Sequence, residues 1–147
     1  MEAVEDRDFV FAAVGAGLLT IDVLLPVPST IVISLLGARL GLVEGWIAAW
    51  LGLTVGNAIG YVLGRLWPAK WAPEVSETPA AVTLIMSRPV PILAEAMTLA
   101  AGAAREPWIT VLISCALGNA IYTFALAANG ALLFAADVGL VAVLFML

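Results

Sequence analysis

The 147-residue sequence contains no histidine and only one cysteine, and both absences narrow its function. Histidine is the commonest side chain for proton transfer near neutral pH and the commonest metal ligand, so its absence argues against histidine-based catalysis and a metal centre. A lone Cys115 excludes a disulfide within the chain. Because no nucleophile with a neighbouring base is recognisable either, we expect no enzyme activity, no cofactor and no metal.

Charged side chains are also scarce. They make up 12% of the residues, whereas 63% are hydrophobic and the mean hydropathy is +1.10. Soluble domains average about 45–50% apolar and about 25% charged residues, so the composition predicts an integral membrane protein. A formal net charge of −5 without a basic cluster argues against nucleic acid as a partner. The first residues, "MEAVEDRD", are acidic where a secretion signal would be basic, so we expect no cleavable signal peptide.

Long apolar segments make up most of the chain. Crossing a hydrocarbon core of about 30 Å takes roughly 20 helical residues, so the length allows a few helical elements in a single membrane domain over residues 1–147. The segments are Phe9 to Leu25, Thr30 to Leu42, Trp46 to Trp67, Ala80 to Ala104, and Trp108 to Leu147, the last divided near Asn129-Gly130.

The clearest span is Trp46 to Trp67, which has no internal proline and is bracketed by tryptophans of the kind that favour membrane interfaces. Glycine recurs along it every four residues, at Gly52, Gly56, Gly60 and Gly64. This spacing lays a smooth strip along one helix face and lets another backbone approach closely. We therefore predict a buried helix that packs on a partner through this glycine strip.

Two proline pairs interrupt the apolar segments. Pro26 and Pro28 form the first pair, and Pro89 and Pro91 form the second. Proline lacks an amide hydrogen and clashes with the preceding turn, so each pair should end a helix. Lipid cannot satisfy the freed carbonyls, so such a break survives only inside protein or beside a wet cavity.

The segment after the first break, residues 30–42, is too short to span, and the chain should turn back as a re-entrant hairpin. The second break predicts another such hairpin. Residues 80–104 are long enough to cross as a single proline-kinked helix, which stays the alternative there.

The two breaks belong to an internal repeat. "PVPSTIVISLLGARLGLVEGW" at Pro26 to Trp46 parallels "PVPILAEAMTLAAGAAREPW" at Pro89 to Trp108, and each is followed by a helix that carries "GNAI". If each unit is a hairpin plus one span, the second lies upside down relative to the first. We predict an all-α integral membrane fold with an inverted repeat of re-entrant helical hairpin plus transmembrane helix and a C-terminal transmembrane helix. Repeat 1 covers about residues 9–67, repeat 2 about residues 79–129, and the last helix residues 131–147.

Ionisable residues near the breaks are the candidates for chemistry, because each costs a few kcal/mol at membrane depth unless it is paired, hydrated or neutralised. Asp22 lies four residues before Pro26, and Glu95 lies four residues after Pro91. Arg88 immediately precedes the second break, where its guanidinium could hold a phosphate bidentately. This pattern predicts a site for an anionic head group, in which Asp22 or Glu95 takes up and releases a proton.

These residues also have structural interpretations. Arg88 with Glu95 or Asp22 could form a buried ion pair that locks the hairpins together. Asn57 and Asn119 occupy equivalent repeat positions, and hydrogen bonding between helices is the structural role expected of them.

Two further arginines, Arg39 and Arg105, lie at the ends of the second hairpin legs. There we expect interfacial anchors whose side chains reach the head groups.

An ordered set of motifs resembles the DedA or VTT-domain (SNARE-associated) family of membrane proteins. The motifs are "LLPVPSTIVISLLGARLG", "GNAIGYVLGR", "RPVP", "LAEAMTLAAG" and "PWITVLISCALGNA", between about Leu24 and Asn119. The resemblance implies two facing re-entrant hairpins and movement of a lipid, such as undecaprenyl phosphate or a phospholipid, between leaflets, often with proton coupling. It implies a multi-pass protein of the bacterial inner (plasma) membrane.

The sequence departs from the family pattern at three positions. The acid that many members carry just after the first hairpin proline is Ser29 here, the aspartate before "GY" is Asn57, and the second arginine of the arginine-proline motif is Ala94. Asp22 and Glu95 are the acids that could substitute for the missing ones, as in a shorter branch of the family.

The sequence therefore predicts a lipid flippase or scramblase. Its partners are a lipid with a phosphate head group and protons, and we expect a homo-oligomer, because so small a bundle can scarcely shield two hairpins from lipid. The predicted binding residues are Arg88, Glu95, Asp22, Pro26, Pro28, Pro89, Pro91, Ser29 and Asn57. The alternative is a membrane scaffold or assembly partner that transports nothing and docks through the glycine strip.

Overall fold

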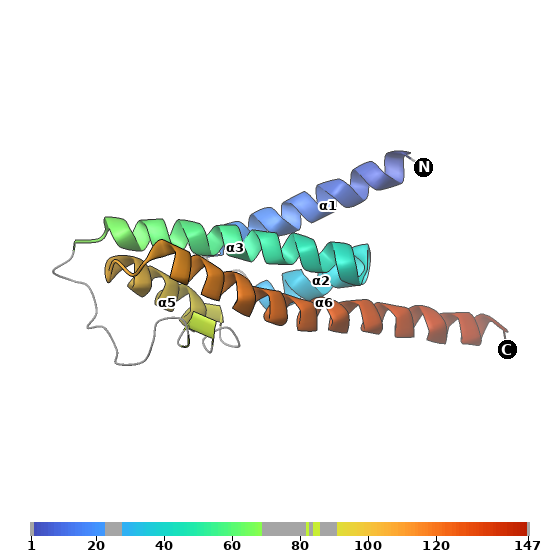
Figure 1. Ribbon diagram of the computed structural model, residues 1–147. Helices are drawn as coiled ribbons and strands as arrows, with labels where there is room; N and C mark the ends of the chain where they lie inside the picture. The colour runs from blue at the N-terminus through green and yellow to red at the C-terminus, as the bar shows by residue number, and fades with distance from the viewer. Residues whose placement is uncertain (1, 23–27, 69–81, 83, 86–90, 147) are drawn as a thin grey trace.

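The computed structural model describes residues 2–22, 28–68, 82, 84–85 and 91–146, and within them the chain forms helices and no strand. The predicted all-α fold class is confirmed at this level. The helices are α1 (Glu2–Ile21), α2 (Ser29–Leu40), α3 (Leu42–Leu66), α5 (Pro91–Ala103) and α6 (Trp108–Met146) (Figure 1).

The second proline of each pair marks the start of a helix. Pro28 directly precedes α2 with a φ of −71°, and Pro91 is the first residue of α5. Proline suits this place because its fixed φ matches a helix and its missing N–H would lack an intrahelical partner anyway. Pro26 and Pro89 lie outside the described residues. As expected from the first pair, one helix ends before it, at Ile21.

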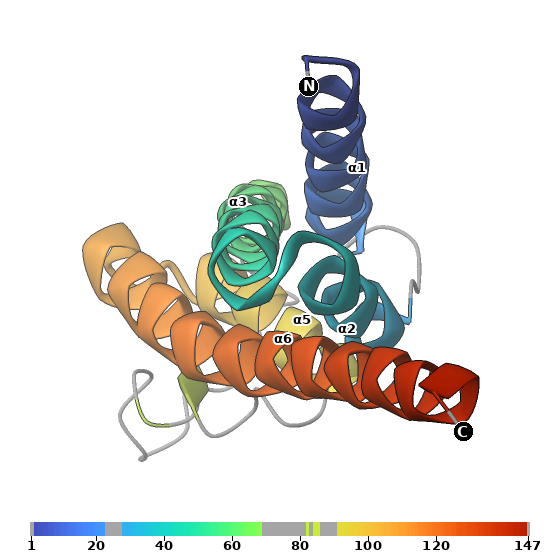
Figure 2. The same cartoon turned by 90° about the vertical axis from the view of Figure 1, so that its right-hand side faces the viewer.

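Helix α3 contacts each of the other four labelled helices and forms the centre of the bundle. Along the bundle, α2 and α5 run in opposite directions, and so do α3 and α6 (Figure 1). The N-terminal part of α1 diverges from α3, and the C-terminal part of α6 extends past the ends of the other helices (Figures 1 and 2). The helices therefore meet most closely in the middle of the molecule.

The glycine strip of α3 receives two helices of the same chain. A Cβ added at Gly52 would meet the backbone of Ala16, and one added at Gly56 would meet the backbone of Thr20, both near the end of α1. A Cβ at Gly64 would collide with the backbone of α5. The prediction that α3 packs through this strip is confirmed, whereas the prediction that the helix is buried holds for one face only, because large apolar side chains on its other face are exposed.

Glycines also bring α2 and α6 into backbone contact. Gly37 of α2 lies against the backbone of Ala127, and Gly130 of α6 lies against the backbone of Ser34. The same reciprocal arrangement joins α3 and α5, where Gly64 lies against Leu99 and Gly102 lies against Tyr61. In each of these two helix pairs, one glycine of each helix therefore packs against the backbone of the other helix.

Helix α6 corrects one expectation. It runs without a break from Trp108 to Met146, so the predicted division near Asn129-Gly130 and a separate helix over residues 131–147 are wrong. A single glycine costs a helix only about 1 kcal/mol relative to alanine, and no proline accompanies it. Gly130 instead lets α6 approach α2. At 1.5 Å per residue, the 39 residues of α6 extend about 58 Å, and the 25 residues of α3 about 37 Å.

Two stretches of the described residues, Leu42–Leu66 and Trp108–Ala136, are long and apolar enough to cross a membrane. Both also expose large aliphatic side chains. On α3 these recur every three or four residues, at Val43, Ile47, Leu51, Val55, Ile59 and Val62. An exposed apolar stripe of this length is suited to contact with lipid, and it suggests association with a membrane.

Candidate functional site

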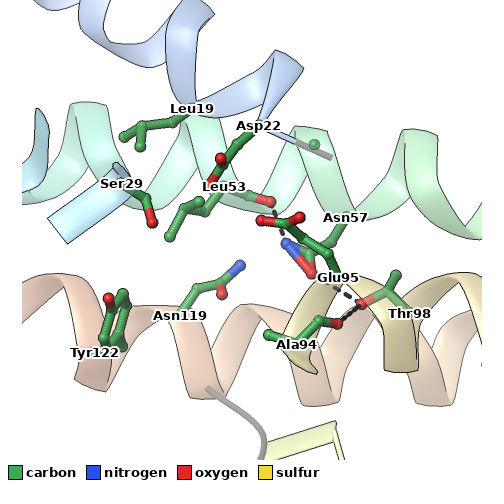
Figure 3. Close-up of a pocket in the computed structure, with 11 residues that line it drawn as sticks. Leu19, Asp22, Ser29, Leu53, Asn57, Ala94, Glu95, Thr98, Asn119 and Tyr122 are labelled. Atoms are coloured by element: carbon green, nitrogen blue, oxygen red, sulfur yellow. Dashed lines mark hydrogen bonds between the residues drawn. The ribbon is translucent and has the colours of Figure 1, made fainter. Parts of the chain in front are cut away.

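Polar side chains from four helices, and Asp22 directly after α1, meet around a small cavity between α3 and α6 (Figure 3). The cavity has a volume of about 30 Å³. This is room for a water molecule or two. Its lining consists of Leu19, Asp22, Ser29, Leu53, Gly56, Asn57, Ala94, Glu95, Thr98, Asn119 and Tyr122.

Five of the polar residues at this cavity are almost completely removed from the surface, whereas Glu95 and Tyr122 are partly exposed. Asp22 is 4% exposed, Ser29 2%, Asn57 7%, and Thr98 and Asn119 are fully buried. Polar groups in an apolar interior are costly unless they are hydrogen-bonded, so a cluster of this size is maintained only by mutual contacts or water. The helix bundle therefore contains a cluster of buried polar side chains surrounded by apolar ones.

Asn57 and Thr98 connect α3 to α5 across this cluster. The Thr98 hydroxyl lies 3.1 Å from Asn57 Oδ1 and 2.8 Å from the carbonyl oxygen of Ala94, so it can donate to either acceptor. The Asn57 amide donates to the carbonyl of Leu53 on its own helix. These contacts fix the Asn57 carboxamide with its oxygen toward α5 (Figure 3).

Helix α6 is attached to α3 on the other side of the cavity. Asn119 Nδ2 donates to Thr54 Oγ1 at 3.3 Å. The indole nitrogens of Trp46 and Trp50 donate to carbonyls of α6 at 3.0 and 2.8 Å. These three bonds make α3 and α6 a connected wall of the cavity.

Four of the predicted site residues lie together at the cavity: Asp22, Glu95, Ser29 and Asn57. The carboxyl groups of Asp22 and Glu95 enter from opposite helices, at the end of α1 and in α5, and point into the same space (Figure 3). Of the remaining predicted residues, Pro28 is exposed and Pro91 begins α5, whereas Arg88, Pro26 and Pro89 lie outside the described residues. The structure thus brings both predicted acids into one cavity.

Thr98, Asn119 and Tyr122 line the cavity without having been predicted to bind anything. The interhelical hydrogen bonds expected of Asn57 and Asn119 are present. Helical spacing was the signal for the other two, since Thr98 follows Glu95 by three residues and Tyr122 follows Asn119 by three. Residues three apart share a helix face.

Two helices begin at this cavity. Ser29 is both the first residue of α2 and part of the lining, and α5 begins one turn before Ala94 and Glu95. The amino end of a helix carries a partial positive charge and unpaired N–H groups, so it favours an anion, either a carboxylate or a phosphate. Among the described residues, no group of three or more acids and cysteines is arranged to hold a metal ion. The site thus combines two carboxyl groups, several hydrogen-bonding side chains and the amino ends of two helices.

Thr98→Val tests the connection between α3 and α5. We expect it to lower the free energy of unfolding by about 1–2 kcal/mol, because Asn57 Oδ1 loses a partner in a buried site. Thermal unfolding in detergent measures the change, and Thr110→Val, at an exposed threonine of α6, is the matched control.

A second measurement separates this bond from general packing. If Thr98 and Asn57 are coupled, the losses caused by Thr98→Val and Asn57→Leu combine to less than their sum in the double variant. Strict additivity, or an equal loss in Thr110→Val, would contradict the assignment.

No protein-family model, curated protein or solved structure matches the chain.

Proposed function

We propose that this protein moves a lipid with an anionic phosphate head group between the leaflets of a bacterial inner (plasma) membrane. The observation that carries the proposal is the shared position of Asp22 and Glu95 at a buried polar cavity where two short helices begin. A bundle that needed only stability would gain from an apolar centre, since buried acids must be paired, hydrated or protonated. A buried polar cavity of this kind is suited to the passage of a polar head group through the membrane.

Short helices support a re-entrant arrangement. The 12 residues of α2 and the 13 of α5 extend only about 18–20 Å, less than the roughly 30 Å of a hydrocarbon core. Each begins at the cavity, so in a bilayer its amino end would lie at depth. We propose that α2 and α5 are the second legs of two facing hairpins, which is the arrangement that transporters with broken helices use to build a site.

Three features support an inverted repeat. The repeated sequence pairs α2 with α5 and α3 with α6, and the members of each pair run in opposite directions along the bundle (Figure 1). Reciprocal glycine contacts join α2 to α6 in the same way as they join α5 to α3. Exchanging the two repeats exchanges these two helix pairs, as an internal two-fold relation requires.

The proposed chemistry depends on protonation of the two acids. Ionised carboxylates repel a phosphate, whereas neutral carboxyl groups can donate a hydrogen bond to it beside the amino ends of α2 and α5. Entry of the head group would therefore favour uptake of protons by Asp22 and Glu95, and release of the protons would favour its departure. Arg88, which adjoins Pro89 in the sequence, is the proposed guanidinium contact for the phosphate.

In the proposed transport cycle, the small cavity corresponds to an occluded conformation. About 30 Å³ accommodates a water or two, and a phosphate with its ester groups needs more. We propose that the bundle opens toward one leaflet at a time, with the protonation state of the acids biasing which opening is populated.

The order of the sequence motifs resembles the DedA and VTT-domain proteins, which supports the same function. The scaffold alternative is less favoured, because the glycine strip on which it depends is occupied by α1 and α5 of the same chain. That surface is therefore not available for docking a separate protein.

A cavity-filling variant tests the proposal. Ala94 is 4% exposed and lines the cavity, so Ala94→Leu places extra methyl groups in the proposed path without altering any charge. We expect at least a roughly ten-fold slower flip of a fluorescent anionic phospholipid in reconstituted vesicles, which is about 1.4 kcal/mol on the barrier. The assay measures how fast inner-leaflet label becomes accessible to an impermeant quencher.

Ala96→Leu is the control, because Ala96 lies on the same helix and is exposed. It should retain the wild-type rate. Flip by the wild-type protein no faster than in empty vesicles would refute lipid transport, and equal rates in the two variants would refute this path.

A further inference from the structure

A second groove lies on the outer surface, between α1 and the end of α2, and shares no lining residue with the central cavity. Its volume is about 380 Å³, and it is lined by Asp6, Arg7, Val10, Phe11, Val14 and Arg39. The groove contains two of the six cationic residues of a chain whose net charge is −5. This concentration of arginines is not explained by the proposed transport path.

Arg39 is held in place by two neighbours on α1. Its Nε lies 3.6 Å from Asp8 Oδ1, and its Cζ lies 4.8 Å from the centre of the Phe11 ring. A guanidinium has five N–H donors, so an ion pair through Nε leaves the terminal nitrogens able to bind a second anion. The side chain is 46% exposed and can meet that anion from outside the bundle.

The α1 side of the groove changes from charged to apolar along the helix. Arg7, Val10, Phe11 and Val14 have the spacing of one helix face. Along the axis, Arg7 and Val14 are about 10 Å apart. Arg39 meets this face at the level of Asp8 and Phe11, within about one helical turn of Arg7 along the axis.

We propose that this groove binds an anionic phospholipid of the surrounding membrane as a fixed ligand. The phosphate bridges Arg7 and Arg39, and an acyl chain lies against Val10, Phe11 and Val14. A charged end followed by an apolar wall matches the order of groups in a lipid, and guanidinium groups favour bidentate contact with phosphate. Asp6 borders the groove and Asp8 pairs with Arg39, so these acids offset part of the positive charge. The expected preference for an anionic over a zwitterionic lipid therefore depends on direct contact of both guanidinium groups with the phosphate.

Native mass spectrometry of the purified protein, with phosphatidylglycerol or phosphatidylcholine added, tests the proposal without any transport measurement. Phosphatidylglycerol should be retained preferentially, and Arg7→Gln with Arg39→Gln should lower its retention at least about ten-fold, which corresponds to about 1.4 kcal/mol. Arg105→Gln removes one positive charge, as either single variant does, from an exposed position in the α5–α6 connection and should leave retention unchanged. Equal retention of the two lipids by the wild type, or equal losses in the double variant and Arg105→Gln, would overturn the assignment.

Asp8→Asn distinguishes a ligand contact from a structural role of Arg39. It removes the ion pair and keeps both arginines, so phosphatidylglycerol should be retained at least as well as by the wild type. Loss of the lipid in this variant would mean that the pair only stabilises the packing of α1 on α2, which contradicts the proposed site.

Discussion

Lipid flip is expected to fall to the background rate when Glu95 is replaced by glutamine. Glutamine keeps the shape and hydrogen-bonding capacity of the side chain but cannot exchange a proton, so the proposed cycle of anion entry and departure stops. The reconstituted-vesicle assay described above measures the rate, and the wild type should depend on pH whereas Glu95→Gln should not. Asp22→Asn should have an effect in the same direction, because both acids line one cavity.

Glu44→Gln provides the control for this prediction. Glu44 lies in the first turn of α3 and is exposed, so its replacement changes the net charge equally without touching the central cavity. Its flip rate should match the wild type. A Glu95→Gln variant that is folded and moves lipid at the wild-type rate would show that Glu95 has no part in the cycle.

Gly130→Leu is expected to have the largest effect on stability. The backbone of Ser34 lies where a Cβ at position 130 would be placed, so the side chain forces α6 away from α2. Overpacking typically costs about 1–3 kcal/mol, and we expect about 3 kcal/mol or more here because the obstacle is backbone and cannot change rotamer. Unfolding in detergent, followed by circular dichroism, measures the loss. Gly37→Leu on the facing helix should act similarly, since its Cβ would meet the backbone of Ala127.

Gly17→Leu is the matched control, because nothing lies within 4 Å of a Cβ at this position of α1. Its stability should stay within about 0.5 kcal/mol of the wild type, as is usual for surface substitutions away from special contacts. If Gly17→Leu and Gly130→Leu lose the same amount, the effect comes from leucine itself and not from the α2–α6 contact.

The sequence identified most of the fold through its apolar segments and prolines. Trp46 to Trp67 was recognised as a helix because its length and flanking residues are sufficient evidence on their own, and α3 covers nearly the same residues. The error at Gly130 arose because glycine has two structural uses. A glycine that ends a helix and one that admits a neighbouring helix look alike in a sequence, and only the position of Ser34 distinguishes them.

The candidate site was predictable where charge made a residue conspicuous. Asp22 and Glu95 are acids in apolar surroundings, which is a strong signal in a single sequence. Thr98 and Tyr122 were missed because hydroxyl groups are common in membrane helices, and their position depends on how α5 and α6 rotate against α3. Helical spacing places Thr98 on the face of Glu95 and Tyr122 on the face of Asn119, but which face meets the cavity follows from tertiary packing, including the bonds from Trp46 and Trp50.

Because α6 is so long, the amount of its apolar surface that lipid covers depends on the thickness of the bilayer. In the membrane proposed here, α6 is about 58 Å long and the hydrocarbon core is about 30 Å thick. To fit wholly within the core, the helix would have to tilt by about 60° from the bilayer normal, which is beyond the usual range of about 0–40°. In that membrane, part of α6 lies outside the slab that α3 crosses, and its apolar residues Leu132, Leu133 and Phe134 are largely uncovered by the rest of the chain. Thicker bilayers would cover more of this apolar surface, and hydrophobic mismatch would favour residence of the protein in the thicker regions of a membrane.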